Sequence, residues 1–288
     1  MGRERQGLGS LLGPYFLGER ADDLEGVRQR IREMGYLGHR TGWIEPACWD
    51  LIGKARGQPV YELLGGEGGE IRLYASTGEI RPLPERVESV VERREEGFDT
   101  VKLRVHAATL EEDVALIRGV REAVGDSIAL GVDANQGWRV AVVADAPRWD
   151  AERALAFCRA AEDLGFSWVE EPLPMDDFVG LARLAEAVGI PIAGGELHVR
   201  GLPELESMIE RRCYDLFQPD AAASAPSATS AWPRDRGSST PGSRPDEIPS
   251  PRPWRPWTSP PPAPKHCSPP SHSLTGQPGW KYTFHGIE

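Results

Sequence analysis

The 288-residue sequence contains no uninterrupted apolar run long enough to cross a membrane, and its four cysteines form no CxxC pair. No GxGxxG or GxxxxGK[ST] motif follows any predicted strand, which disfavours the nucleotide-binding α/β folds. The opening apolar segment is broken by glycine, serine and proline, unlike a signal peptide. These absences predict a cytoplasmic protein without membrane or nucleotide-binding elements.

A basic surface is also missing. The net charge is -11 and the isoelectric point is near 5.2, which argues against a nucleic-acid partner because phosphates are bound by basic surfaces. Cys48, Cys158 and Cys213 fall inside apolar patterns, so we expect them to be buried, reduced thiols. Cys267 lies apart from these patterns.

The composition changes abruptly near residue 221. Residues 221–288 hold 15 of the 26 prolines and carry a net charge of +3, whereas the preceding residues carry -14. Such a change in proline content and in the sign of the charge marks a boundary. We expect residues 224–288 to be an irregular tail rich in proline, serine and arginine.

Before that boundary, short apolar runs alternate with amphipathic helical patterns in units of about 25 residues. The predicted strands are 71–76, 100–105, 128–135, 167–172, 191–196 and 214–220, each separated from the next by one predicted helix. Regular alternation of this kind implies parallel strands with right-handed crossovers. Both a doubly wound sheet and a TIM barrel fit the pattern.

Residues 1–69 lack this alternation and are predicted to be helical. Residues 21–34 and 43–66 have helical patterns, and the second pattern ends at Gly65 and Gly66. One face of the second pattern combines Ile44, Ala47, Cys48, Leu51 and Ala55.

Acidic residues stand at the ends of four consecutive predicted strands: Asp133, Glu170 with Glu171, Glu196 and Asp220. The preceding strand carries Lys102 and Arg104, two residues apart and therefore on one face. In a TIM barrel the carboxyl ends of the strands form the active site, so these side chains would converge there.

Asp133, Glu170 and Glu196 would together offer oxygen ligands to a hard divalent cation such as Mg²⁺. Any single acidic residue after a strand is explained equally well by the preference of carboxylates for loops. The repetition over four strands, beside two cationic residues, favours the metal site.

Several motifs then resemble the mandelate racemase and muconate lactonizing branch of the enolase superfamily, over about residues 8–223. They occur in the family's order: ACWDLIGKARGQPVYELLGG, VKLR, VDANQGW, WVEEP, GGE and FQPDAA. The resemblance implies a (β/α) barrel preceded by an α+β capping domain. It also implies homo-oligomers among intact relatives and a small carboxylate substrate, either a sugar acid or a 2-hydroxy acid.

The resemblance also implies roles for individual residues. Asp133, Glu170 and Glu196 would bind Mg²⁺, with Asn135 near the metal or substrate and Glu171 supporting Glu170. Lys102 would face the substrate carboxylate, and Arg104 stands where many relatives have a catalytic lysine. Asp220 matches an aspartate that orients a catalytic histidine on the next strand.

The implied reaction removes the proton next to a carboxylate, while Mg²⁺ and Lys102 stabilise the enediolate. Arg104 departs from the pattern, because a guanidinium stays protonated and is a poor general base. A site with only one base, the histidine paired with Asp220, suits dehydration of a sugar acid better than racemisation. The histidine, however, finds no counterpart in residues 221–288.

We therefore expect an incomplete TIM-type (β/α) barrel of about six of the eight strands in residues 70–223. Residues 1–69 would be the helical remnant of a capping domain shortened at its N-terminus, and the unrelated tail would result from a frameshift. The predicted function is Mg²⁺-dependent proton abstraction, of dehydratase or racemase ancestry and impaired in this chain. The alternative is an inactive fragment or pseudoenzyme that interacts through RPWRPWTSPPPAPK as a polyproline II ligand.

Overall fold

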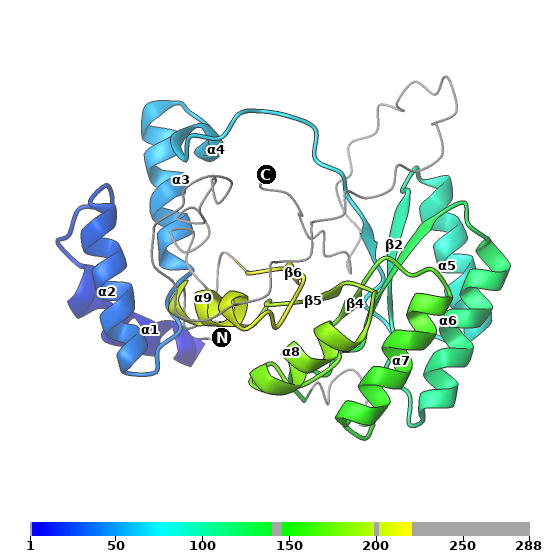
Figure 1. Ribbon diagram of the computed structural model, residues 1–288. Coiled ribbons are helices and arrows are strands. Elements are labelled where there is room, and N and C mark those ends of the chain that lie inside the picture. Colours follow the sequence, from blue (N-terminus) through cyan, green and yellow to red (C-terminus); the bar gives the residue numbers. More distant parts are fainter. Residues whose placement is uncertain (1, 140–145, 199–201, 221–288) are drawn as a thin grey trace, which may run out of the picture. The chain divides into compact units, whose positions relative to one another are not determined.

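The computed structural model describes residues 2–139, 146–198 and 202–220 (Figure 1). The helices are α1 (Gly2–Phe16), α2 (Leu24–Tyr36), α3 (Ile44–Arg56), α4 (Val60–Leu63), α5 (Leu83–Glu95), α6 (Leu110–Val124), α7 (Ala151–Asp163), α8 (Phe178–Ala187) and α9 (Leu202–Glu210). The strands are β1 (Ala75–Ser76), β2 (Thr100–Arg104), β3 (Ala129–Asp133), β4 (Val169–Glu170), β5 (Ile192–Gly194) and β6 (Leu216–Phe217). All six predicted strands are confirmed, each shorter than predicted.

The strands form one parallel sheet in the order β1-β2-β3-β4-β5-β6, with a helix after each of the first five. This is the strand order of a (β/α) barrel rather than of a doubly wound sheet, in which the chain reverses direction from a central strand. Within the described residues β1 and β6 are the edges, which agrees with the prediction of an incomplete barrel of six strands.

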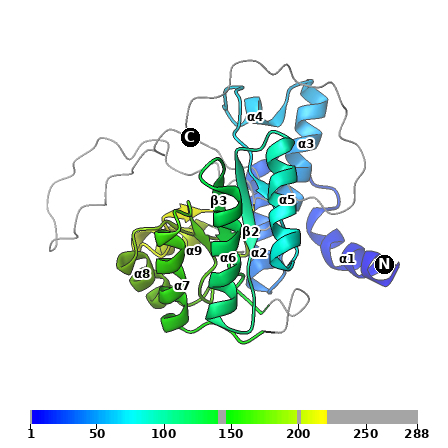
Figure 2. The same ribbon diagram turned by 90° about the vertical axis from the view of Figure 1, so that its right-hand side faces the viewer.

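Helices α5 to α8 lie side by side along one face of the sheet (Figures 1 and 2). Their apolar stripes form the main core with the outward side chains of the strands, and Leu103, Leu130 and Phe157 are completely buried there. Local signals fix where these helices begin. Thr109, for example, forms a reciprocal capping box with Glu112 at the start of α6.

The opposite face of the sheet carries a smaller cluster of Tyr74, Trp168, Ala193 and Leu216. Two strand glycines make room for aromatic rings, Gly131 on this face and Gly194 on the face of the main core, to which Tyr214 belongs. A side chain at Gly131 would overlap the Trp168 ring, and a Cβ at Gly194 would lie 2.5 Å from Tyr214 Cζ. Glycine at these strand positions therefore serves packing, since Gly131 and Gly194 are not among the residues with positive φ.

Helices α2 and α3 pair through the buried Glu45, which accepts hydrogen bonds from Arg28 and Trp49. The helical pattern predicted for 43–66 is interrupted at Gly57, whose φ is +63°, and Pro59 then precedes α4. The predicted apolar face was also wrong. Leu51 is exposed, while Cys48 and Ile52 are buried, because α3 turns the face carrying Glu45 inward.

Cys48, Cys158 and Cys213 are buried free thiols, as predicted. None of the described helices is long and apolar enough to span a membrane. The predicted tail, residues 224–288, and Cys267 within it lie outside the described residues. The boundaries proposed at residues 70 and 224 stay predictions.

Candidate active site

Four of the predicted site residues lie at one end of neighbouring strands. The parallel register pairs Arg104 of β2 with Asp133 of β3, and Asp133 with Glu170 of β4. Lys102 precedes Arg104 by two residues and so points to the same face. The charged side chains therefore cross the carboxyl end of the sheet as one row, as the sequence predicts for a barrel active site.

Lys102 holds two of the carboxylates together. Its Nζ lies 2.6 Å from Glu170 Oε1 and 3.6 Å from Asp133 Oδ2, and the Lys102 and Glu170 side chains are 8% and 5% exposed. Burial by itself lowers the pKa of Lys102, but the charges of Glu170 and Asp133 more than offset it. The pKa is therefore raised, and the ammonium stays protonated.

Glu170 is held through both of its oxygens. Oε1 accepts a hydrogen bond from Lys102, and Oε2 accepts one from Gln218 Nε2 at 3.1 Å and a longer one from Trp168 Nε1 at 3.4 Å. Burial and the negative charge of Asp133 raise the pKa of Glu170 and outweigh Lys102, which lowers it. Two carboxylates at this site thus share one buried ammonium.

The backbone is strained directly after β3 and β4. Asn135 and Glu171 have φ values of +50° and +47°, a region that glutamate rarely adopts. Non-glycine residues in this conformation cost about 1–3 kcal/mol and occur preferentially at functional sites. The backbone N–H of Asn135 donates to Asp133 Oδ1 at 2.9 Å, which fixes the orientation of the Asp133 carboxylate.

The Glu171 carboxylate is buried against the backbone of Gly137. A Cβ added at Gly137 would lie 2.7 Å from Glu171 Cδ. Burial, then the charges of Asp133, Glu170 and Glu196, raise the pKa of Glu171 to about 8. Glu171 therefore lies within electrostatic range of Asp133, Glu170 and Glu196. The cations of the row are Lys102 and Arg104, which both contact Asp133.

Glu196 is placed differently from the prediction. It is exposed, in the turn after β5. The next histidine along the chain, His198, is buried, with its ring nitrogens 3.4 Å from Glu204 and 3.5 Å from the Tyr214 hydroxyl. His198 thereby anchors the turn.

No group of three His, Cys, Asp or Glu side chains in the described part of the chain is arranged to hold a metal ion. The predicted convergence of Asp133, Glu170 and Glu196 is therefore met by the first two alone. Asp133 and Glu170 are held together by their shared contact with the buried ammonium of Lys102, whereas Glu196 is exposed to solvent.

The donor set nevertheless fits a divalent cation. Several carboxylates interact unfavourably here with too few positive charges, and all the ligand atoms available are oxygens, which Mg²⁺ prefers. Asp133 and Glu170 would hold the ion from the sheet, and Glu196 would complete the set from its turn. Arg104 lies at the edge of this row, with Nη2 3.4 Å from Asp133 Oδ2.

Asp220 is exposed at the last described position, and its predicted histidine partner would fall among residues that the structure does not describe. The roles assigned to Asp220, to Asn135 and to Lys102 as substrate contacts stay predictions.

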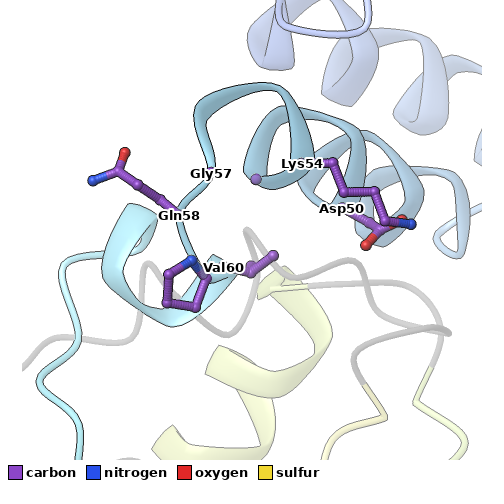
Figure 3. Close-up of a pocket in the computed structure, with 7 residues that line it drawn as sticks. Asp50, Lys54, Gly57, Gln58 and Val60 are labelled. Carbon is purple, nitrogen blue, oxygen red and sulfur yellow. The ribbon is translucent and has the colours of Figure 1, made fainter.

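A separate surface hollow lies where α3 ends and α4 begins, lined by Asp50, Gly53, Lys54, Gly57, Gln58, Pro59 and Val60 (Figure 3). It contains none of the predicted site residues. We therefore assign the chemistry to the row of charges at the sheet and not to this hollow.

Gln218 and Trp168 are site residues that the sequence reasoning missed. Both lie inside motifs quoted for the resemblance, FQPDAA and WVEEP, yet neither motif shows that their side chains meet at Glu170. The only available signal was the even spacing of Trp168 from Glu170, which places the two on one face.

The chain is similar to proteins of known family. Residues 85–225 match the family described as "Enolase C-terminal domain-like". The L-talarate/galactarate dehydratase of Salmonella typhimurium is 34% identical over 215 residues, which are 72% of this chain and 51% of that enzyme. The arabinonate dehydratase of Saccharolobus solfataricus is 32% identical over 62% of this chain and 45% of its own. This chain thus spans about half the length of the curated relatives it matches.

Solved structures show the same likeness. The L-talarate dehydratase from Polaromonas sp. JS666, crystallised with Mg and L-glucarate, has a TM-score of 0.64 and 29% identity over 74% of this chain and 58% of that one. A racemase from Streptomyces coelicolor A3(2) with bound magnesium has a TM-score of 0.66 and 28% identity, over 75% and 64% of the two chains. With the parallel strand order and the carboxylates at the strand ends, these matches show that residues 85–225 are an enolase C-terminal domain-like segment.

Proposed function

We propose that this chain carries the site for Mg²⁺-dependent abstraction of the proton next to a carboxylate, with a sugar acid as substrate and dehydration as the outcome. The observation that carries the proposal is the buried row in which Lys102 bridges Asp133 and Glu170 at the carboxyl end of the sheet. The dehydratase names of the two curated relatives support the substrate class.

Lys102 has the charge that such a reaction needs. Removal of the proton puts a second negative charge on the substrate carboxylate, and a buried ammonium stabilises that charge strongly because little water screens it. Mg²⁺ held by the carboxylates of the protein would supply further positive charge to the oxygens of the substrate carboxylate.

Arg104 contributes charge but not basicity. A guanidinium remains protonated at neutral pH, so Arg104 can bind a substrate oxygen but cannot accept the proton. A positioned general base contributes about 10²–10⁴-fold to a rate. We propose that the chain is impaired in catalysis for this reason, and that lysine at position 104 would restore a group able to exchange a proton.

The test measures proton exchange in the absence of full turnover. The whole chain and Arg104→Lys are incubated with Mg²⁺ and a panel of sugar acids in deuterium oxide. Deuterium incorporation at the α-carbon is followed by NMR, and 2-keto product is assayed in parallel. Arg104→Lys should exchange at least about 10-fold faster than the parent chain, and Lys102→Met should abolish the exchange.

Lys54→Met is the matched control, because Lys54 is an exposed lysine at the hollow of Figure 3 and takes no part in the charged row. Exchange that is undetectable in both the parent chain and Arg104→Lys, with Mg²⁺ shown to be bound, would contradict the proposed reaction. Exchange that is unchanged in Lys102→Met would contradict the role of Lys102.

A further inference from the structure

The side chain of Gln218 crosses the inside of the sheet. It follows β6, yet its Nε2 donates to Glu170 Oε2 on β4 at 3.1 Å, with the whole of β5 between the two strands. The hydrogen bond joins residues 48 positions apart in the sequence and ends on a carboxylate that is 5% exposed.

Small residues on β5 leave the space for this contact. Ala193 is the register partner of Glu170, and it is followed by Gly194 and Gly195. A Cβ at Gly195 would lie 3.3 Å from the backbone nitrogen of Gln218, and the φ of Gly195 is +121°, a conformation that residues with side chains rarely adopt. The small side chain of Ala193, on the same face as Trp168, therefore lies between Glu170 and Gln218, and Gly195 lets the backbone of Gln218 approach β5 closely.

The hydrogen bond from Gln218 fixes the orientation of the Glu170 carboxylate, which would otherwise turn toward Lys102. Lys102 attracts Glu170 through Oε1 at 2.6 Å, and without a second donor both oxygens could turn toward the ammonium. Gln218 and, at the longer distance of 3.4 Å, Trp168 hold Oε2 away from Lys102. The orientation of the carboxylate is thus set by donors on β2, directly before β4 and directly after β6.

We propose that Gln218 is a positioning residue that orients Glu170 as a ligand of the divalent cation and so determines the affinity of the site for that ion. The proposal rests on the proposed function, because it takes Glu170 to be a metal ligand. Partners that orient the ligands of a metal typically change its affinity by 10–100-fold when they are removed. We expect Gln218→Met, which keeps the length of the side chain but removes the donor, to weaken Mg²⁺ binding by about 10-fold or more.

The experiment uses the full chain. Binding of Mg²⁺ is measured by titration calorimetry and binding of Mn²⁺ by electron paramagnetic resonance, for the parent chain, Gln218→Met, Gln218→Asn and Gln58→Met. Gln58 is exposed where α3 meets α4, so Gln58→Met should bind both ions as the parent does (Figure 3). Gln218→Asn retains an amide donor and should fall between the parent and Gln218→Met.

Thermal unfolding with and without metal separates positioning from a general structural role. The free energy of unfolding that a bound ion adds grows with the logarithm of the ratio of the free ion concentration to Kd. If Gln218 positions Glu170, Gln218→Met lowers the stabilisation that Mg²⁺ confers and leaves the unfolding temperature in EDTA close to that of the parent.

Equal metal affinities of Gln218→Met and the parent chain, within about 2-fold, would overturn the inference and leave the proposed function standing. Equal losses of stability with and without Mg²⁺, with unchanged affinity, would likewise reduce Gln218 to a structural residue. A parent chain that binds neither ion would overturn the proposed function and, with it, the inference.

Discussion

Two lysine–carboxylate pairs in this protein have the same distance between nitrogen and oxygen but differ in their exposure to solvent. Lys102 Nζ lies 2.6 Å from Glu170 Oε1, and Lys54 Nζ lies 2.6 Å from Asp50 Oδ2. The first pair is 8% and 5% exposed, and the second is 73% and 57% exposed. Replacing each lysine by methionine therefore tests the effect of burial at constant distance.

We expect Lys102→Met to lower the free energy of unfolding by about 3–5 kcal/mol, because it leaves the Glu170 and Asp133 carboxylates buried without their shared counter-charge. Lys54→Met removes an exposed pair spaced four residues apart on a helix and should cost about 0.3–0.5 kcal/mol. Both values are obtained from urea unfolding of the full chain in EDTA.

The double variant Lys102→Met with Glu170→Gln should recover much of the lost stability, since it removes one of the unpaired charges. The cost of Lys102→Met should also shrink as the pH is lowered. The pKa of Glu170 is raised above its ordinary value, so this carboxylate takes up a proton in the folded state more readily than in the unfolded chain, and protonation removes the unpaired charge.

Mg²⁺ affinity gives a second readout of Lys102→Met, and it should rise whereas the stability falls. Without the ammonium, Mg²⁺ no longer competes with a fixed positive charge for the same oxygens, so Lys102→Met should bind Mg²⁺ more tightly than the parent chain while exchanging no α-proton. A Lys102→Met chain that is destabilised no more than Lys54→Met, or that binds Mg²⁺ more weakly than the parent, would contradict the role assigned to the buried ammonium.

Three further expectations follow from the core. Gly194→Ala should destabilise the chain by about 1–3 kcal/mol in urea unfolding, because its Cβ would overlap the Tyr214 ring, and Gly194→Ala combined with Tyr214→Leu should restore part of the loss. Phe157→Ala should cost about 3–5 kcal/mol by the same measurement, since the ring is completely buried beneath α7. Burial raises the pKa of the Cys158 thiol to about 12 and that of the Cys213 thiol to about 11. Iodoacetamide near neutral pH should therefore label neither thiol until urea is added. Mass-spectrometric detection of either adduct in the folded chain would contradict this expectation.

Much of the barrel segment follows from local pattern. The six strands and five intervening helices were predictable because apolar periodicity and turn residues act over a few positions. The placement of Lys102, Arg104, Asp133 and Glu170 at one end of the sheet was predictable for a related reason. Parallel strands all end at the same edge, so residues at strand ends become neighbours whatever the details of packing.

The tertiary structure decided the rest, because those contacts depend on the curvature of the sheet and on which side chains fill it. The meeting of Gln218 with Glu170 requires β4 and β6 to approach across the small residues of β5, and no period within either strand carries that information. The pairing of Lys102 with Glu170 and the exposure of Glu196 likewise depend on where folding places these side chains, 68 and 26 residues apart from Glu170 in the sequence. The sequence by itself thus determined which residue types stand at the ends of the strands, and only the packing of the strands decided which of them touch.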